Sequence, residues 1–467
     1  MQQAAAYPSS HPIGFYVLFF TELWERFGFY LLRALLVLYM TTRLQMTEAQ
    51  ALELFGSFQG LVYLTPPFGG LLADRVIGLK RAVVLGGVLI AAGHLVMTVE
   101  SKAALLAAMG LIALGNGLFK PNMQSLLSAL YKEGDPRHDQ AFSRYYLAVN
   151  LGAMVAPVLG ALMARHLGWA VAFGSAAAGH CIGLATFWTF RRHLVDNRSP
   201  LAQALDQPID PDAGSEFRGS DPPDSGRRIA AIVAVTLIVS LFWAVYLADG
   251  GALTLWAKEC VSGLKHYSTL TNAINPIGIL VLTPIIVWAV QAVNLRRPGR
   301  PIGPLHMLLT GLLLSAGAAA VLVIGAAGSA RGRSIGWLLG FYLLITTGEL
   351  LVSPLGSALV ARLAPQRLRG FLLGVWYLAS STGGFISGQI GRTAWPALSH
   401  SGYFAVLAGV GLAGATIVVL LWKPLSRLVD GRQKPDAPAD GAVRRWDAAG
   451  QKIAARRQPG AGTRKAA

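Results

Sequence analysis

Charge and cysteine are both scarce in this sequence. Only 13% of its 467 residues are charged, and its two cysteines, Cys181 and Cys260, are too few for a disulfide framework and stand in no metal-ligand spacing. We interpret both as packing residues. The opening stretch MQQAAAYPSSHP lacks the basic segment that begins a cleavable signal, so we expect the first apolar segment to be retained as a spanning helix.

Hydrophobic residues make up 54% of the chain and recur in runs of about twenty residues, the length that crosses the hydrocarbon core of a bilayer. This pattern predicts an all-α membrane protein with twelve transmembrane helices. Their expected limits are 13–40, 49–76, 80–99, 103–129, 140–165, 169–190, 228–257, 268–294, 304–326, 335–361, 368–391 and 401–422.

The basic residues gather in alternate loops. A net charge of +17 would suit a nucleic-acid-binding protein, but the arginines and lysines form neither one domain nor one face. They follow every second predicted helix, and the other loops are short and poorer in them, with Arg331 and Arg333 as a local exception. By the positive-inside rule both termini are cytoplasmic, and the expected partner of the chain is the lipid bilayer, not nucleic acid.

A polar segment divides the chain. DQPIDPDAGSEFRGSDPPDSG, after the sixth predicted helix, cannot bury apolar surface and predicts a flexible cytoplasmic linker. The expected parts are an N-terminal six-helix half at 1–190, the linker at 191–227, a C-terminal six-helix half at 228–422, and a basic, disordered cytoplasmic tail at 423–467.

The two halves resemble each other in sequence. YYLA at 145–148, followed by Gly152, aligns with WYLA at 376–379, followed by Gly383. Parallel repeats of this kind, with twelve helices and a central linker, are the organisation of major facilitator transporters, whose substrate site lies between the halves near the middle of the membrane.

The first predicted helix carries a polar stripe. Its residues recur at spacings of three or four and therefore share one face. They are Glu22, Glu25, Arg26, Tyr30 and Arg33. One charge at the centre of a lipid-facing helix costs roughly 2.5–3.5 kcal/mol, so four would cost on the order of 10 kcal/mol. We expect the stripe to line a cavity; a purely structural ion-pair cluster that joins helices is the alternative.

Further polar residues lie deep in other predicted helices. Lys120 in the fourth helix and Glu349 in the tenth occupy comparable places in the two halves, with opposite charge. A lysine near a helix end usually extends to the membrane surface, but Lys120 stands well before the loop. Neutral donors and aromatic cavity walls would be Asn150, Asn275, Tyr30, Tyr63, Trp243 and Trp376. Taken alone, each aromatic side chain more often faces lipid or packs in a core.

At these residues the sequence resembles the proton-dependent oligopeptide transporters within the major facilitator superfamily. ELWER matches that family's Glu-x-x-Glu-Arg signature in helix one, GLFKPNMQSLL its helix-four lysine motif, and FSRYYLAVNLGA its helix-five signature. INPIG, GELLVSP and the loop GGLLADRVIGLKRAV are similar to further motifs of the family and superfamily. The likeness runs in order from His11 to Trp422, without the two extra helices that many bacterial members insert between the halves.

The resemblance implies that Glu22 and Glu25 carry protons. Arg26 would couple their protonation to the substrate carboxylate, because an adjacent arginine holds a carboxylate ionised. Asp74 and Arg75, in the loop after the second helix, would be gating residues, although a plain surface charge that obeys the positive-inside rule fits them as well.

The resemblance also implies how a short peptide binds. Arg33 and Lys120 would take its C-terminal carboxylate, and Glu349, with Asn275 nearby, its amino group. Charges of opposite sign on the two walls suit a zwitterion whose side chains vary, since the backbone ends are common to all peptides. Lys120 and Glu349 are therefore expected to face each other across the cavity.

Helix seven departs from the family pattern. Members carry Phe-Trp-x-x-x-Glu there, and counting from Phe242 places Leu247 where the glutamate should stand. Asp249 is the nearby acid, but two residues along a regular helix is about 200° around, which would turn it away. Unless Gly250-Gly251 loosens the helix enough to redirect Asp249, Arg33 lacks its usual partner. We then expect altered proton coupling, and Leu247→Glu should strengthen concentrative uptake.

The predicted function is import of di- and tripeptides with protons, by alternating access, in the plasma membrane. The protein would act as a monomer, without a cofactor or metal, and would not be an enzyme. The same fold would serve an exporter or a porter of another small zwitterion or anion. A non-transporting peptide sensor and a membrane enzyme are further alternatives, although no nucleophile–base pair or phosphate-binding loop accompanies the buried Glu and Lys.

Overall fold

A computed structural model describes most of the chain, and within it the described residues are almost wholly helical, with no strand. One isolated β-bridge joins Val261 to Arg333. Of the predicted linker, 195–224 lie outside the described residues, as do 430–467 of the predicted tail, so both remain predictions. The described residues are 10–132, 135, 137–194, 225–296, 302–328, 331–364 and 369–429.

The first group of helices follows the local signals of the sequence. Thr47 and Gln50 form a capping box at the start of α2, and the Ser101 hydroxyl accepts the backbone N–H of Ala104 at the start of α5. The elements are α1 (Ile13–Thr42), α2 (Glu48–Leu64), α3 (Pro66–Leu72), the π-helix η1 (Ala73–Ile77), α4 (Leu79–Val96), α5 (Lys102–Ala129), α6 (Arg137–His166), α7 (Trp169–Phe190) and the 3₁₀ turn η2 (Arg191–His193).

The second group contains two interrupted helices. A π-helical turn, η3 (Asp249–Leu253), separates α9 (Ser225–Tyr246) from α10 (Thr254–Cys260), and the 3₁₀ segment η4 (Ser268–Ala273) leads into α11. The remaining elements are α11 (Ile274–Arg296), α12 (Pro304–Gly325), α13 (Gly336–Leu363), α14 (Arg369–Ala394), α15 (His400–Leu420) and the short α16 (Trp422–Val429).

All twelve predicted helices are present, with limits that differ from the expected ones by at most three residues. The second expected span is α2, α3 and η1 together, the seventh is α9, η3 and α10, and the eighth is η4 and α11. By length and apolar composition, nine helices of the described part qualify as membrane spans. α1 is not among them, because every window of it contains at least three of its charged residues.

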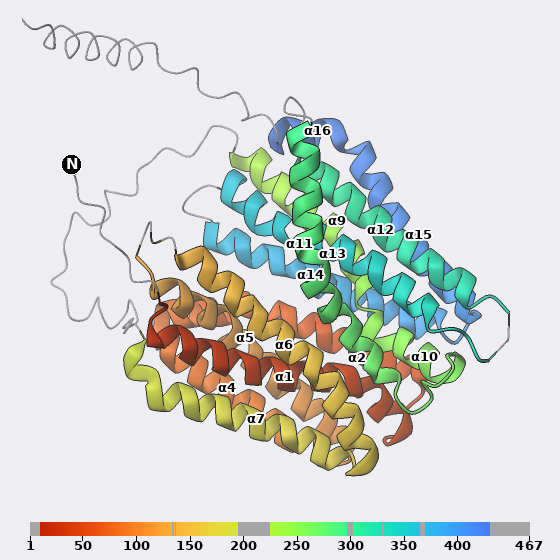
Figure 1. The fold of residues 1–467 in the computed structure, drawn as a ribbon, viewed down its shortest axis with the longest axis horizontal. Coiled ribbons are helices and arrows are strands. Elements are labelled where there is room, and N and C mark those ends of the chain that lie inside the picture. Colours follow the sequence, from red (N-terminus) through yellow and green to blue (C-terminus); the bar gives the residue numbers. More distant parts are fainter. Residues whose placement is uncertain are drawn as a thin grey trace, which may run out of the picture.

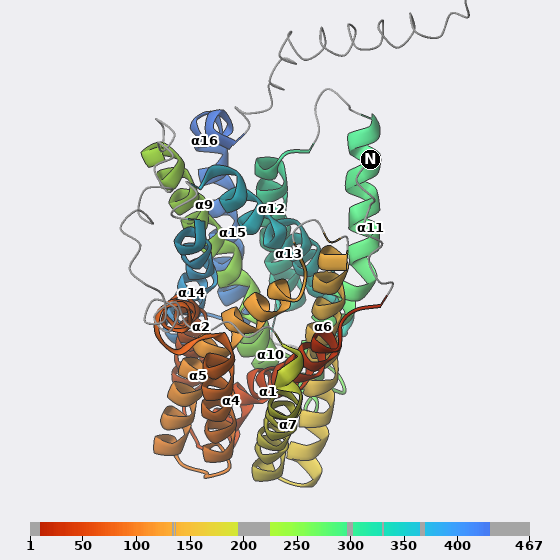
Figure 2. The same ribbon diagram turned by 90° about the vertical axis from the view of Figure 1, so that its left-hand side faces the viewer.

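The helices form two bundles. Figures 1 and 2 show α1–α7 on one side of the molecule and α9–α16 on the other. α2 packs against α14, and α6 against η4 and α11, across the boundary between them. We call the end of the molecule that carries 43–47, 261–267 and 395–399 the short-loop face, and the end where α7 finishes and α9 begins the linker face.

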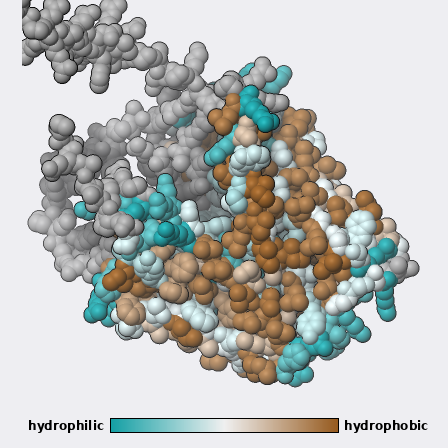
Figure 3. Space-filling view, in the orientation of Figure 1, coloured by the Kyte–Doolittle hydropathy of each residue, from teal (hydrophilic) through white to brown (hydrophobic). Residues whose placement is uncertain are grey.

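The outer surface agrees with a bilayer environment. In the space-filling view, hydrophobic side chains cover the middle of the molecule, and hydrophilic ones gather towards its ends (Figure 3). Many large apolar residues are exposed, such as Leu237, Trp288 and Leu420. Both cysteines are free thiols. Cys260 is half-buried and packs against the buried cluster, as expected, whereas Cys181 is exposed, so its interpretation as a packing residue was wrong.

Glycines allow the closest helix approaches. A methyl group added at Gly152 of α6 would lie 2.9 Å from the Leu23 carbonyl oxygen of α1, and one at Gly383 of α14 would lie 2.8 Å from the Ser240 carbonyl oxygen of α9. These two glycines occupy matching places in the sequence repeat, and each seats its helix on the first helix of its own bundle. The repeated sequence therefore makes the same packing contact twice.

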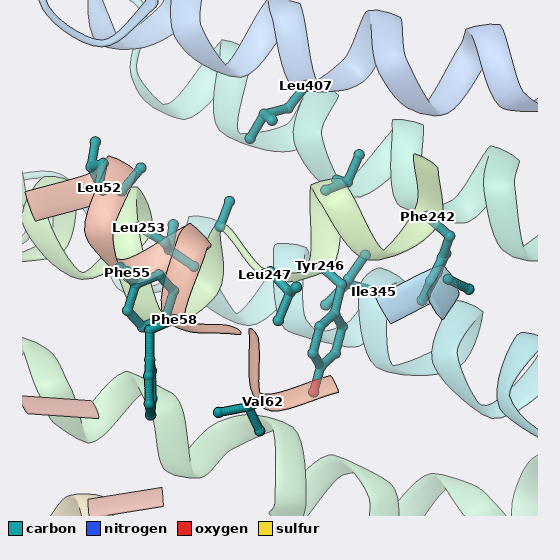
Figure 4. Packing of buried hydrophobic residues seen from close by; sticks show 14 of the residues in the cluster. Leu52, Phe55, Phe58, Val62, Phe242, Tyr246, Leu247, Leu253, Ile345 and Leu407 are labelled. Atoms are coloured by element: carbon teal, nitrogen blue, oxygen red, sulfur yellow. The ribbon is translucent and has the colours of Figure 1, made fainter. Parts of the chain in front are cut away.

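The boundary between the bundles is closed by another glycine pair. A methyl group at Gly56 of α2 would lie 2.4 Å from the Cα of Gly388 in α14. No side chain fits at this distance unless the two helices move apart. Beside this seam, α2 residues such as Phe55, Phe58 and Val62 belong to one buried cluster with Tyr246 of α9 (Figure 4). Small residues at the crossing and large ones next to it fix how the two bundles meet.

Candidate functional site

The polar stripe of α1 forms a buried charge cluster. The Arg26 guanidinium forms an ion pair with Glu25 and a second one, at 3.4 Å, with Glu22 one helical turn earlier. All three side chains are at most 3% exposed. Two acids and one arginine share this site, so one carboxyl is in excess over the available positive charge. A group that can gain and lose a proton is what the cluster offers chemically.

Neutral side chains from two other helices complete the cluster. The Tyr145 hydroxyl of α6 donates to Glu22 at 2.5 Å, and Arg26 donates to the Asn116 side-chain oxygen of α5 at 3.3 Å. Asn116 in turn donates to the Val62 carbonyl at 3.0 Å. α1, α2, α5 and α6 are thus joined by hydrogen bonds that begin at the charged groups. Reasoning from the sequence missed both residues, although Tyr145 lies in the matched helix-five motif and Asn116 directly precedes the helix-four motif.

Asp249 pairs with Arg33. The π-helical turn η3 re-aims Asp249, and its carboxylate forms an ion pair with the Arg33 guanidinium, with both residues at most 5% exposed. The same carboxylate accepts the Gly250 N–H at 2.5 Å. The expectation that Asp249 turns away and leaves Arg33 without a partner was therefore wrong. That expectation assumed a regular helix. The π-helical turn that contains Gly250-Gly251 interrupts it, which is the alternative that the sequence analysis left open.

Leu247 belongs to the apolar core. It is 2% exposed and lies in the same buried cluster as Val62, Tyr246 and Leu253, which Figure 4 shows around it. A glutamate there would meet hydrocarbon instead of Arg33. The expected benefit of Leu247→Glu rested on an unpaired arginine and is not supported by this packing.

Besides Asp249, the second bundle contributes Glu349 to the site. Asn275 of α11 donates to Glu349 of α13 at 2.8 Å and lies 3.0 Å from the Thr346 hydroxyl. The Tyr246 hydroxyl donates to the Asn275 side-chain oxygen at 3.2 Å. Glu349 is 9% exposed, and its neighbours in this network are neutral. The expected pairing of Asn275 with Glu349 is therefore present, and Tyr246 is a member that reasoning from the sequence missed.

Lys120 lies on the first bundle. Its ammonium group is 4.9 Å from the centre of the Tyr63 ring, and it interacts electrostatically with Glu22. Within the described residues it forms no ion pair. Tyr30 interacts electrostatically with Tyr63, Arg26, Arg33 and Glu349, so it lies near charged groups of both bundles. That Lys120 and Glu349 face each other stays a prediction.

Several expected wall residues are half-buried, as a cavity lining requires: Tyr30, Tyr63, Lys120, Trp243 and Trp376. Tyr146, which we did not expect, is 46% exposed yet interacts electrostatically with Tyr30 and Glu349. Exposure combined with proximity to groups on both bundles places its ring at the space between them. The sequence signal that could have identified Tyr146 was the pair Tyr145-Tyr146 where the apolar part of α6 begins. Asn150 is buried and donates to the Tyr146 carbonyl at 2.8 Å, so it stabilises its own helix.

Asp74 and Arg75 lie away from this site. Both are exposed on η1 at the linker face, where the chain turns between α3 and α4. Gly78 follows with φ of 81°, a conformation that favours glycine. Their surroundings suit either a gate or a plain surface charge, so the gating role stays a prediction. Within the described residues, the cluster suited to a metal is Glu259, Cys260 and His400 at the short-loop face, not the central acids.

The chain has clear relatives in sequence. The Major Facilitator Superfamily profile matches residues 18–388. Dipeptide and tripeptide permease A of Edwardsiella piscicida is 32% identical over 479 residues, covering 88% of this chain and 93% of the relative. The permease of the same name from Escherichia coli (strain K12) is 31% identical, covering 93% and 95%. That of Chromobacterium violaceum is 34% identical, covering 85% and 88%.

Solved structures share the fold. A crystal structure of the peptide transporter POT in complex with sulfate matches with a TM-score of 0.79 at 26% identity, covering 91% of this chain and 97% of that chain. A structure of a mutant peptide transporter POT in complex with alafosfalin matches with a TM-score of 0.79 at 27% identity, with the same coverage.

Proposed function

Because this chain belongs to the major facilitator superfamily and, within it, to the proton-dependent oligopeptide transporters, we propose that it carries di- and tripeptides across the membrane together with protons. The permeases that it resembles are named for dipeptides and tripeptides. The chain keeps the charged groups that such a substrate needs, as the following arguments describe.

The observation that carries the proposal is the separation of charge between the bundles. The first bundle presents three cations, Arg26, Arg33 and Lys120, against the two acids Glu22 and Glu25, which leaves one positive charge in excess. The second bundle presents only acids among these charged groups, Asp249 and Glu349. A peptide in its zwitterionic form has one charge of each sign at its ends. Groups of opposite sign on the two walls therefore bind its backbone ends and leave its side chains unspecified.

The ion pairs divide the cationic groups between two tasks. Arg33 is occupied by Asp249, and Arg26 by two glutamates. Lys120 contacts the Tyr63 ring and forms no ion pair within the described residues. We therefore assign the peptide carboxylate to Lys120. Glu349, held by Asn275, takes the amino group. Charged partners that are already paired bind substrate less well than one that is free.

Protons enter through the acids of α1. Glu25 and Glu22 compete for Arg26, and protonation of one carboxyl leaves the arginine to the other. When a peptide carboxylate approaches this cluster, it competes for the same positive charge and favours that protonation. Substrate binding and proton binding then support each other, which is the physical basis of symport.

Alternating access would use the contacts at the short-loop face. Arg392 of α14 donates to Glu53 of α2 at 2.8 Å, Trp395 donates to Glu48 at 2.6 Å, and Arg33 pairs with Asp249 nearby. These contacts join the two bundles and must separate when that face opens. By the positive-inside rule the short-loop face is the outer one and both termini are cytoplasmic, in a plasma membrane where the protein acts as a monomer.

Uptake by purified protein in proteoliposomes tests the proposal. Labelled dialanine should accumulate when an inward proton gradient is applied and only equilibrate without one. Glu25→Gln should abolish accumulation while exchange of labelled for unlabelled dialanine partly survives. Glu100→Gln is the matched control, because Glu100 forms a half-exposed surface pair with Arg43. Full accumulation in Glu25→Gln would remove that acid from the coupling, and no uptake of any peptide by the wild type would overturn the function.

A further inference from the structure

A cavity of about 1210 Å³ opens on the short-loop face, outside the site just described. It lies between the ends of α2, α10 and α15 and the segments 326–328, 331–333 and 395–399. Among its lining residues are three that coordinate metals in proteins, Glu259, Cys260 and His400, and none of them takes part in the proposed transport site.

The three side chains come together in space from distant parts of the chain. Cys260 Sγ lies 3.8 Å from His400 Nδ1, and Glu259 Oε2 lies 3.6 Å from His400 Nε2. One donor atom of each residue lies within 4.8 Å of the donors of the other two. Zinc bonds of about 2.3 Å to sulfur and about 2.0 Å to nitrogen place neighbouring donors about 3.5 Å apart. The distances to Cys260 and Glu259 end on different nitrogens of His400, only one of which can bind the ion, so one of these two side chains must rotate toward the other nitrogen before the three donors close on one ion.

A fourth candidate donor comes from the other bundle. The Glu48 carboxyl, in the first turn of α2, lines the same cavity and interacts with Glu259, outside the group of three donors that lie within 4.8 Å of one another. Trp395 fixes this arrangement, since its Nε1–H donates to Glu48 at 2.6 Å and its ring lies 4.9 Å from the His400 ring. Partners of this kind orient the ligands of metal sites.

We propose that Glu48, Glu259, Cys260 and His400 form a binding site for a transition-metal ion, with Zn²⁺ as the best fit. A thiolate and an imidazole are ligands that select Zn²⁺ over Mg²⁺ and Ca²⁺, and the two carboxylates complete four coordination. Cys260 and His400 are partly exposed and Glu259 is exposed, so an ion reaches the site from solution.

The surrounding charges suit the occupied site. Lys258, Arg331 and Arg333 interact electrostatically with Glu259 or Cys260. Two carboxylates and one thiolate exceed the charge of Zn²⁺ by one negative unit, which these cations offset. The same cations repel the incoming ion, so we expect the thiolate bond to dominate the affinity.

The site spans the two bundles, and this part of the inference rests on the proposed alternating access. Glu48 begins α2 in the first bundle, whereas the other three ligands belong to the second. Opening of the short-loop face would pull Glu48 away from them. An ion bound by all four ligands therefore favours the state in which this face is closed. It shifts the equilibrium between the closed and open states by the ratio of its affinities for them, and transport slows accordingly.

Titration of the purified full-length protein with Co²⁺, a coloured substitute for Zn²⁺, tests the site without any transport assay. The wild type should develop a sulfur-to-Co²⁺ charge-transfer band that excess Zn²⁺ removes. Cys260→Ser should lose the band, and the matched Cys181→Ser variant, which removes the other thiol, should keep it. A wild type without the band, or a band that persists in Cys260→Ser, overturns the site.

Further variants guard against a folding defect in Cys260→Ser. His400→Gln and Trp395→Phe retain both thiols, and we expect each to weaken Co²⁺ affinity by about tenfold or more. Thermal unfolding in detergent checks that each variant is folded. If both folded variants bind Co²⁺ as tightly as the wild type, His400 is not a ligand and the proposal fails.

Transport tests the consequence separately. Zn²⁺ added to both sides of the proteoliposomes should inhibit dialanine uptake by the wild type and by Cys181→Ser, and Glu48→Gln should relieve the inhibition while the Co²⁺ band persists. Equal inhibition of Glu48→Gln and the wild type overturns the bridging role. If the protein transports no dialanine at all, the function fails and the Co²⁺ titration still decides the metal site.

Discussion

Removal of one partner from a buried ion pair leaves the other charge uncompensated, at a cost of about 3–5 kcal/mol. Arg33 and Asp249 are such a pair, at most 5% exposed. Asp249→Asn should therefore reduce gradient-driven uptake of dialanine by tenfold or more, because the closed short-loop face loses a contact between the bundles. Initial rates in proteoliposomes measure this, with exposed Asp139→Asn as the control. Uptake at the wild-type rate in Asp249→Asn would show that the pair has no part in the cycle.

A substitution at Leu247 should lower the stability of the fold and should not improve proton coupling. Leu247 is enclosed by apolar side chains, so Leu247→Glu buries a carboxylate without a partner, which costs several kcal/mol. We expect a lower yield of folded protein and a lower thermal unfolding temperature in detergent, whereas Leu247→Met, of similar volume, should resemble the wild type. Stronger concentrative uptake at unchanged thermal stability would contradict this and show that Arg33 prefers the new acid.

At the scale of the element, the crossing of α2 and α14 depends on the absence of side chains. Gly56→Ala would place a methyl group 2.4 Å from the Cα of Gly388, so the two helices must move apart. We expect uptake to fall at least fivefold through a weakened contact between the bundles. Gly110→Ala in α5 is the matched control, since nothing lies within 4 Å of its added methyl group.

The control variant Gly110→Ala carries its own prediction for thermal stability. Alanine is more favourable than glycine inside a helix by about 1 kcal/mol, so Gly110→Ala should transport normally and unfold at the same or a higher temperature. The two variants share one chemical change and differ only in the space around it. If both lose activity equally, loss of helix flexibility, and not the α2–α14 contact, explains the effect.

At the scale of the whole molecule, the bundles should separate at the short-loop face during transport. Glu53 and Arg392 join the bundles there, whereas Arg43 and Glu100 pair within the first bundle. In a background of Cys181→Ser and Cys260→Ser, a short reducible crosslinker between Glu53→Cys and Arg392→Cys should block uptake, and reduction should restore it. The same crosslinker between Arg43→Cys and Glu100→Cys should leave uptake unchanged. Transport that continues with the bundles crosslinked would rule out opening at this face.

The sequence by itself determined the helices and their limits, because the length of an apolar run, a cap such as Thr47 and a polar stripe such as that of α1 are local properties of the chain. It also determined that Glu22, Glu25 and Arg26 share a face, since helical spacing alone brings them together. The motifs around Lys120 and Glu349 gave the family, because their order along the chain is itself sequence information.

Only the tertiary structure decided the partners of these groups. Tyr145 reaches Glu22 from 123 residues away, and Asp249 reaches Arg33 from 216 residues away through a π-helical turn that a regular 100° spacing does not describe. Glu259, Cys260 and His400 likewise come together at the short-loop face from α10 and α15. Which faces of distant helices meet depends on close packing of the whole bundle, and small departures from helical geometry change the direction of a side chain by more than the sequence pattern specifies.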